Sequence, residues 1–190
     1  MPSGSSVLDI GCGQGLLASL MRAANQQSAQ GDLPPGWPSV GIPGSFRGIE
    51  RQQRDVDRAR IALGSHADFV VVDMRETIFG QADTVVVLDV LHYVDYQAQE
   101  EILHRIHTAI SPDGRLILRV GDAGRVVQAW LGRLVDSLVL LGRRQWPVAQ
   151  YCRTQADWIK LLEQNSFSVQ ILADDEPGIF ANVLMIARAA

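Results

Sequence analysis

Several features that would assign the sequence to a special class of protein are missing or scarce. The 190 residues include only two cysteines, Cys12 and Cys152, too few for a disulfide framework or a structural zinc site. No apolar run approaches the roughly 20 residues of a membrane-spanning helix, and the first six residues lack the basic segment of a signal peptide. Basic residues are not in excess, because 17 lysines and arginines stand against 21 aspartates and glutamates, a net charge of −4. These absences argue against binding to nucleic acid or a membrane surface and favour a reducing cytoplasm.

What is present is the composition of an ordinary globular domain. Hydrophobic residues make up 47% of the chain and charged residues 20%, both near the average for such domains. The length suits one domain over residues 1–190, which buries enough surface to fold without a metal or disulfides. We therefore expect the function to be carried by a local site.

Short apolar runs alternate with helical patterns along the chain. The runs predict strands at residues 7–10, 46–50, 69–72, 84–88, 115–120, 167–172 and 183–187. Helical spacing predicts helices over residues 16–24, 51–63 and 96–110, and Thr154 is expected to cap another through Leu162. The strand runs are rich in β-branched residues and nearly continuous, as in parallel strands covered on both faces. The predicted fold class is α/β, a doubly wound, mostly parallel sheet of seven strands that ends in a β-hairpin.

Two segments interrupt this alternation. Residues 26–47 hold four of the eight prolines and predict a long irregular loop. Residues 121–151 predict a lid-like insertion of one or two helices, which either covers an acceptor molecule or only packs its tryptophans onto the domain. The aromatic and basic residues of this insertion are Trp130, Trp146, Tyr151, Arg125, Arg133, Arg143 and Arg144.

A cluster of glycines follows the first predicted strand and precedes the first predicted helix. Ligands of open parallel sheets bind beyond the carboxyl ends of the strands, and glycines let a ligand approach the backbone there. The dinucleotide fingerprint G-x-G-x-x-G would need its third glycine at Leu16, so the spacing disfavours a nicotinamide-dependent oxidoreductase. The single lysine, Lys160, also forms no Tyr-x-x-x-Lys pair. The pattern present is G-x-G-x-G preceded by an acid.

This pattern, made by Asp9, Gly11, Gly13 and Gly15, resembles motif I of the class I S-adenosylmethionine-dependent methyltransferases. The resemblance extends over residues 6–187. It implies the strand order 3-2-1-4-5-7-6 with strand 7 antiparallel, a Rossmann-like fold. It also implies S-adenosyl-L-methionine as the methyl donor and S-adenosyl-L-homocysteine as the product.

Further donor-binding residues follow from the same resemblance. Glu50, which ends the second predicted strand, is expected to bind both ribose hydroxyls, because a carboxylate accepts what a diol donates. Asp73, after the third strand, is expected to bind the adenine amino group. The resemblance further places Cys12, Arg51, Met74 and Leu88 in the donor site.

The segment from Leu88 to Asp95 is the best indication of the acceptor. It resembles the I-L-H-D-W-S-D-E stretch of plant-type phenolic O-methyltransferases, whose histidine is the general base and matches His92. His92 is therefore expected to remove the proton of the acceptor. The alternative is that His92 positions the substrate or only packs against its neighbours. Asp89 is expected to orient His92 or to face the methyl group. His104 and His107 lie one helical turn apart without a third ligand, so no metal site is predicted.

A narrower resemblance links several strings of the chain to methyltransferases of bacterial aryl polyene or xanthomonadin-type pigment clusters. They lie at residues 47–50, 89–94, 118–123 and 180–184. The resemblance implies a small aryl or phenolic acceptor, methylated on oxygen or carbon and free or bound to a carrier protein. The oligomeric state stays open.

One departure from the class I pattern keeps another kind of function in view. Class I enzymes usually carry one or two helices before motif I, whereas six residues precede Val7 here, so we expect a more exposed donor site. The alternative is a degenerate methyltransferase-like domain that binds a protein partner. The complete set of donor residues argues against that alternative.

Overall fold

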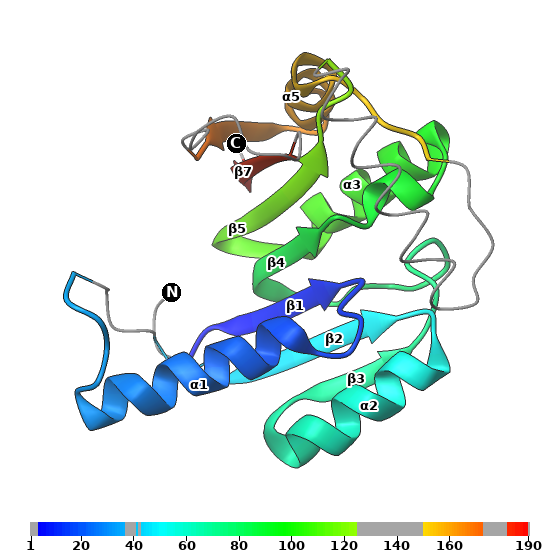
Figure 1. Ribbon diagram of the computed structural model, residues 1–190. Helices are drawn as coiled ribbons and strands as arrows, with labels where there is room; N and C mark the ends of the chain where they lie inside the picture. The colour runs from blue at the N-terminus through cyan, green and yellow to red at the C-terminus, as the bar shows by residue number, and fades with distance from the viewer. Residues whose placement is uncertain (1–3, 37–40, 42, 125–149, 173–181, 190) are drawn as a thin grey trace. The chain divides into compact units, whose positions relative to one another are not determined.

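A computed structural model describes residues 4–36, 41, 43–124, 150–172 and 182–189 (Figure 1). Seven strands are hydrogen-bonded in the order β3-β2-β1-β4-β5-β7-β6. Neighbours β1–β2 and β2–β3 are parallel, whereas β7 is antiparallel to both β5 and β6. The predicted fold class and strand order are therefore confirmed. The strands are β1 (Ser6–Ile10), β2 (Ser45–Glu50), β3 (Asp68–Val71), β4 (Ala82–Leu88), β5 (Ile110–Gly121), β6 (Phe167–Ile171) and β7 (Asn182–Ala189).

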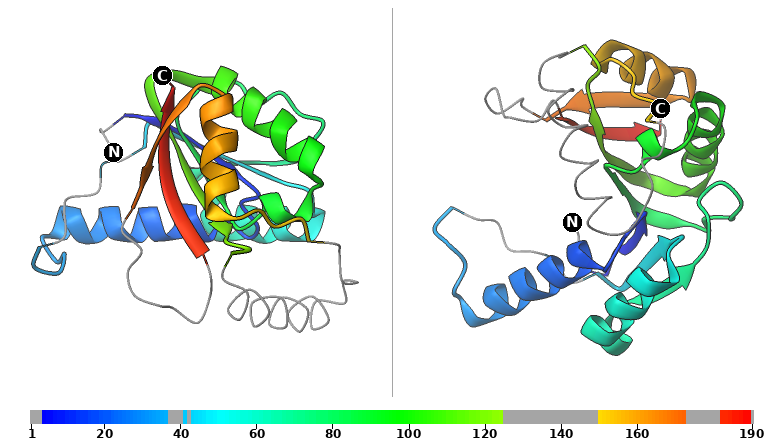
Figure 2. Two further views of the ribbon diagram at one scale, coloured as in Figure 1. Left: turned by 90° about the horizontal axis from the view of Figure 1, so that it is seen from above. Right: turned by 45° about the vertical axis from the view of Figure 1, so that its right-hand side comes forward.

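The chain divides into two compact units, of which the first comprises Met1–Val86 and Ala109–Gly114. Its helices α1 (Leu16–Gln30) and α2 (Gln53–Leu63) lie on the same face of strands β1 to β3 (Figures 1 and 2). The apolar residues of α2 that face the strands recur at helical spacing, and Val56, Ala59 and Leu63 are at most 3% exposed. This packing holds the carboxyl ends of β1, β2 and β3 together.

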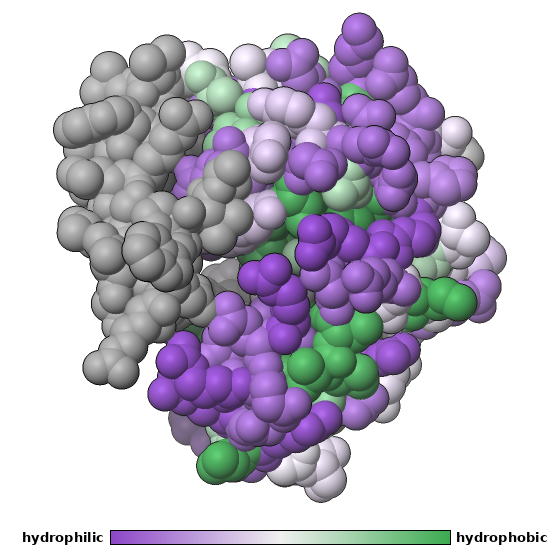
Figure 3. Space-filling model, turned by 90° about the vertical axis from the view of Figure 1, so that its right-hand side faces the viewer, coloured by the Kyte–Doolittle hydropathy of each residue, from purple (hydrophilic) through white to green (hydrophobic). Residues whose placement is uncertain are grey.

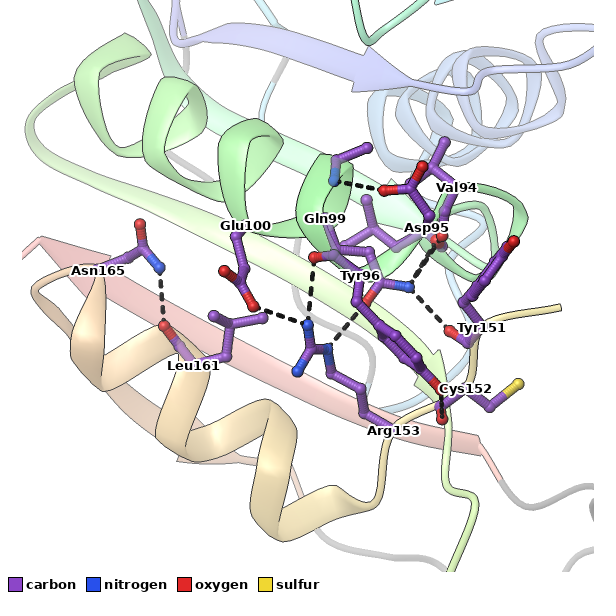
Figure 4. A network of polar contacts seen from close by, with 12 residues as sticks. Val94, Asp95, Tyr96, Gln99, Glu100, Tyr151, Cys152, Arg153, Leu161 and Asn165 are labelled. Carbon is purple, nitrogen blue, oxygen red and sulfur yellow. Dashed lines mark hydrogen bonds and ion pairs between the residues drawn. The ribbon is translucent and has the colours of Figure 1, made fainter.

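The second unit comprises Val87–Thr108 and Arg115–Ala190. Its helices α3 (Tyr96–Ala109) and α5 (Gln155–Gln164) lie side by side on one face of the strands β5, β7 and β6 (Figures 2 and 4). The side chains of Ile102, Trp158 and Met185 are at most 1% exposed in this core. Thr154 caps α5 as predicted: its side chain accepts a hydrogen bond from the Asp157 N–H, and the Asp157 carboxylate accepts one from the Thr154 N–H.

The structure corrects two predictions about helices. Helix α1 continues to Gln30, so the first residues of the segment predicted as loop are helical. No glycine or proline interrupts the chain before Gly31, which ends the helix in a left-handed conformation. The apolar residues that predict a helix over residues 51–63 include Ile61, but Ile61 is 86% exposed, because residues two positions apart lie on opposite sides of a helix and Ala59 and Leu63 are the buried positions.

Two other features of the described chain bear on the predictions. β5 begins at Ile110, earlier than the strand predicted at residues 115–120, and Asp113 within it has a φ of 65°. The helices and most of the lid predicted over residues 121–151 fall on residues 125–149, outside the described residues.

Among the residues described, no helix combines the length and the apolarity needed to cross a membrane. On the face in Figure 3, described hydrophobic side chains form small areas among hydrophilic ones.

Candidate functional site

The glycine turn after β1 is held against the end of β2. The N–H groups of Gly11 and Cys12 both donate to the carbonyl oxygen of Ile49, at 2.8 and 3.1 Å. The N–H of Gly15 closes the turn on the carbonyl oxygen of Cys12 at 3.0 Å. Gly11, Gly13 and Gly15 have φ angles of 77°, 52° and 76°, a region that favours glycine. The spacing recognised in the sequence thus has a conformational cause.

Gly13 and Gly15 serve different purposes within this turn. A Cβ on Gly15 would lie 3.0 Å from side-chain atoms of both Leu63 and Phe69, so this glycine lets the start of α1 pack closely. A Cβ on Gly13 would meet nothing within 4 Å. The backbone at Gly13 therefore borders open space, which a ligand can approach.

Gly48 on β2 permits a second close approach, because a Cβ there would lie 2.7 Å from both Cys12 Sγ and Phe69 Cδ1. We expect Gly48→Ala to lower the free energy of unfolding by about 1–3 kcal/mol through overpacking. Urea unfolding measures this change. Adding Cys12→Ala should restore part of the loss, because it removes the sulfur from the clash. Equal stability of Gly48→Ala and the wild type would contradict the close packing.

The carboxylate of Glu50 connects the end of β2 to the glycine turn. Its Oε2 accepts a hydrogen bond from the Gly13 N–H at 3.2 Å, and its Oε1 accepts one from the Gln52 N–H at 2.9 Å. An ionised carboxylate offers about four acceptor positions, so two remain after these contacts. Glu50 can therefore hold the turn and still accept hydrogen bonds from a diol.

Asp9 and Cys12 are buried beside Glu50. Asp9 is 4% exposed, and burial together with the negative charge of Glu50 raises its pKa from 3.8 to about 7. Burial, followed by the charges of Asp9 and Glu50, also raises the pKa of the Cys12 thiol. The thiol therefore stays protonated at neutral pH and is a packing group rather than a nucleophile.

The raised pKa of Asp9 predicts a change of stability with pH. The folded protein holds the Asp9 proton more tightly than the unfolded chain does, so this contribution to stability is full below about pH 4 and is lost as the pH rises to about 7. We expect Asp9→Asn to remove that loss. At pH 8 the variant should be more stable than the wild type by up to about 4 kcal/mol, from about 1.4 kcal/mol per pKa unit.

Urea unfolding at pH 5 and pH 8 tests this expectation. Asp57→Asn is the matched control, because Asp57 is exposed on α2 and the same carboxyl-to-amide change is made there. Parallel pH profiles of Asp9→Asn and the wild type would contradict the burial argument.

Asp73 and Met74 follow the end of β3 after one intervening residue, also in the first unit. The Asp73 carboxylate accepts hydrogen bonds from Arg75 Nε at 3.0 Å, Nη2 at 2.7 Å and the backbone N–H at 2.9 Å. These contacts, and to a lesser extent the charge of Arg51, hold the pKa of Asp73 below its usual value. Asp73 is thus a fixed anion. The first unit contains every predicted donor residue except Leu88.

Leu88 and Asp89 lie in the second unit, at the end of β4. Asp89 has a φ of 55°, and its N–H donates to the carbonyl oxygen of Arg119 at 3.0 Å. Its carboxylate forms an ion pair with the Arg119 guanidinium, with Nε at 2.8 Å from Oδ2. This pairing raises the pKa of Arg119. The sequence predicted a role for Asp89 but no partner for it on β5.

His92 occupies the middle of a short 3₁₀ turn, Leu91–Tyr93, in the second unit. Its half-buried ring lies beside that of Tyr93, with 4.0 Å between the ring centroids. The His92 carbonyl oxygen accepts a hydrogen bond from the Tyr151 N–H at 2.9 Å. The second unit thus holds both residues predicted to be catalytic, Asp89 and His92.

The histidines of α3 have other surroundings. The His107 ring packs edge-to-face against Phe167, with ring centroids 5.0 Å apart. Within the described residues, no group of three or more His, Cys, Asp or Glu side chains is arranged to hold a metal ion.

Comparisons with known proteins show the family to which the chain belongs. A family model described as a methyltransferase domain matches residues 1–171. No curated protein matches the sequence. A TehB-like methyltransferase from Corynebacterium glutamicum aligns at a TM-score of 0.62 with 19% identity, over 100% of this chain and 83% of that chain.

Two other methyltransferase structures are similar to nearly all of this chain. The mitomycin 7-O-methyltransferase MmcR aligns at a TM-score of 0.66 with 24% identity, over 98% of this chain and 49% of that one. Human N-acetylserotonin methyltransferase, in complex with S-adenosylmethionine, aligns at a TM-score of 0.64 with 19% identity, over 97% of this chain and 47% of that one. The chain spans about half the length of these two proteins. The structures share the fold, and the family model covers most of the sequence: the chain belongs to the family of methyltransferase domains.

Proposed function

We propose that the chain transfers the methyl group of S-adenosyl-L-methionine to a small phenolic or aryl molecule. The observation that carries the donor assignment is the hydrogen bond between the Glu50 carboxylate and the Gly13 N–H. It places an anion with free acceptor positions beside a backbone that borders open space. A ribose diol fits this arrangement. The similar human enzyme, crystallised with S-adenosylmethionine, supports the same donor.

The other residues of the first unit extend the donor site. Asp73, held in one orientation by Arg75, would accept a hydrogen bond from the adenine amino group. Arg51 and Met74 directly follow Glu50 and Asp73 in the chain, Cys12 precedes Gly13, and Leu88 ends β4. The donor supplies an activated methyl group, whose transfer by in-line displacement leaves S-adenosyl-L-homocysteine.

On the acceptor side, His92 would take the proton of the attacking hydroxyl. An imidazole is a weaker base than a phenolate, so proton removal is expected during methyl transfer rather than before it. Asp89, fixed by Arg119, supplies a negative charge near the end of β4. The alternative for His92 is to position the acceptor without taking its proton.

The acceptor class rests on the sequence resemblances. The His92 segment favours a phenol methylated on oxygen, and the narrower resemblance adds an aryl carbon, a carrier-bound head group and a role in pigment biosynthesis. We also propose a cytoplasmic location, because both cysteines are free thiols and the cytoplasm keeps thiols reduced.

Calorimetric titration with S-adenosylhomocysteine, with NAD as the control ligand, tests the donor assignment. We expect micromolar binding of S-adenosylhomocysteine alone. Binding of NAD alone would point to an oxidoreductase. Binding of neither would point to a degenerate domain that acts through a protein partner.

Transfer of a labelled methyl group to catechol and 4-hydroxybenzoate tests the acceptor class, with aniline and a simple thiol as controls. Mass spectrometry of the product identifies the methylated atom. Methylation of the amine or thiol alone would contradict the phenolic assignment.

A further inference from the structure

Gln99 on α3 is a fully buried polar side chain, 0% exposed. Its Nε2 lies within hydrogen-bond distance of three carbonyl oxygens, those of Leu91 at 3.1 Å, Val94 at 3.2 Å and Tyr151 at 2.8 Å (Figure 4). An amide nitrogen carries two hydrogens, so one of them is shared between acceptors. One side chain thus binds three carbonyl groups from two segments of the chain, the turn around His92 and the segment at Tyr151.

Arg153 determines which way the Gln99 amide faces. Its Nε donates to Gln99 Oε1 at 2.8 Å, and arginine cannot accept a hydrogen bond. The amide nitrogen must therefore point at the carbonyl groups. Arg153 is itself held by the Tyr96 carbonyl oxygen at 3.2 Å and the Glu100 carboxylate at 3.0 Å, with its guanidinium 4.8 Å from the Tyr96 ring centroid.

These contacts surround one residue, His92. The Leu91 carbonyl precedes it and the Val94 carbonyl follows it, and both accept from Gln99. The His92 carbonyl accepts from the N–H of Tyr151, whose own carbonyl also accepts from Gln99. The backbone on both sides of His92 is therefore fastened to a single buried amide.

We propose that Gln99, oriented by Arg153, is a positioning residue that sets the place and the surroundings of the His92 imidazole. The inference rests on the proposed function, in which His92 acts on the acceptor. Stability alone does not require a buried amide at this position. An apolar side chain of the same volume would be tolerated there if the chain did not bring the three carbonyl groups together. The amide allows them to converge around the turn that carries His92.

The first test measures His92 directly and needs no acceptor. The protein has four histidines, so their ring C–H signals can be assigned by single substitutions and followed by NMR as the pH changes. In Gln99→Met we expect the titration midpoint of His92 to move by about half a pH unit or more. His104 and His107, on the same helix as Gln99, should keep theirs. An unchanged His92 midpoint, or equal movement of all three, would overturn the proposal.

The matched control is Gln97→Met, the same change two residues away. Gln97 is exposed and bonds only Glu101, at 3.0 Å, among the contacts described. It should leave all four histidine signals in place. Should Gln99→Met fail to fold, Arg153→Lys takes its place: it keeps the positive charge near Glu100 but loses the Nε contact that orients the amide. A His92 signal unaffected by Arg153→Lys would then overturn the proposal.

Kinetics with catechol as the acceptor give the second test. Gln99→Met should lower kcat by about 10-fold or more and leave the affinity for S-adenosylhomocysteine unchanged. In a His92→Ala background the same substitution should have no further effect on kcat. An undiminished effect there would show that Gln99 does not act through His92. If the wild type methylates neither catechol nor 4-hydroxybenzoate, the proposed acceptor class fails, whereas the NMR experiment still tests whether Gln99 positions His92.

Discussion

Replacing His92 with alanine is expected to lower kcat by about 10²- to 10⁴-fold, the range for loss of a general acid or base. Proton removal from the acceptor would then depend on water. The affinity for S-adenosylhomocysteine should not change, because the hydrogen bonds described for the Glu50 carboxylate and the glycine turn are formed with other residues than His92. Initial rates with catechol and calorimetry on the same preparations separate the two effects.

The control for this experiment is His66→Ala, which removes an exposed imidazole in the 3₁₀ turn after α2. Its kcat should equal that of the wild type. A His92→Ala variant within twofold of the wild type would assign His92 to packing, and the acceptor proton would need another base.

Replacing Glu50 with alanine is expected to weaken binding of S-adenosylhomocysteine by about 10-fold or more. A hydrogen bond to a charged group contributes about 1.5–3 kcal/mol, and about 1.4 kcal/mol corresponds to tenfold in affinity. The substitution also leaves the N–H groups of Gly13 and Gln52 without the Glu50 carboxylate. Calorimetric titration measures the loss, and kcat at saturating donor should fall much less than the affinity.

Glu50→Gln distinguishes the two roles of the side chain. Its amide oxygen can still accept from the Gly13 N–H, but it lacks the four acceptor positions that serve the turn and a diol together. We expect an affinity between those of the wild type and Glu50→Ala. Glu163→Ala is the control for removal of a carboxylate, because Glu163 lies near the carboxyl end of α5 and is not among the proposed donor residues. Unchanged affinity in Glu50→Ala would remove this residue from the donor site.

The donor turn could be anticipated from the sequence because its geometry depends on residues within a few positions of one another. Three glycines at alternate positions permit the positive φ angles that this turn adopts, and the strand before them and the helix after them are both strong local patterns. The start of α5 is similar, since Thr154 and Asp157 form a capping box within one turn of helix.

The partners on the acceptor side could not be anticipated in this way. Arg119 pairs with Asp89 across 30 residues, and Arg153 orients Gln99 across 54. Such contacts depend on which strands and helices become neighbours, and no local pattern marks an arginine for one of them. Gln99 also resembles any polar residue of an amphipathic helix until the carbonyl groups that it binds are brought next to it.

The two cysteines differ in a way that has a practical use. Cys12 is 7% exposed, and its thiol is kept protonated, so thiol reagents will reach it slowly. Cys152 is only partly buried and lies between Tyr151 and Arg153. A fluorophore carried by a maleimide will therefore attach first at Cys152 in the unaltered protein. The wild-type chain thus provides its own labelling position, one residue from the arginine that orients Gln99.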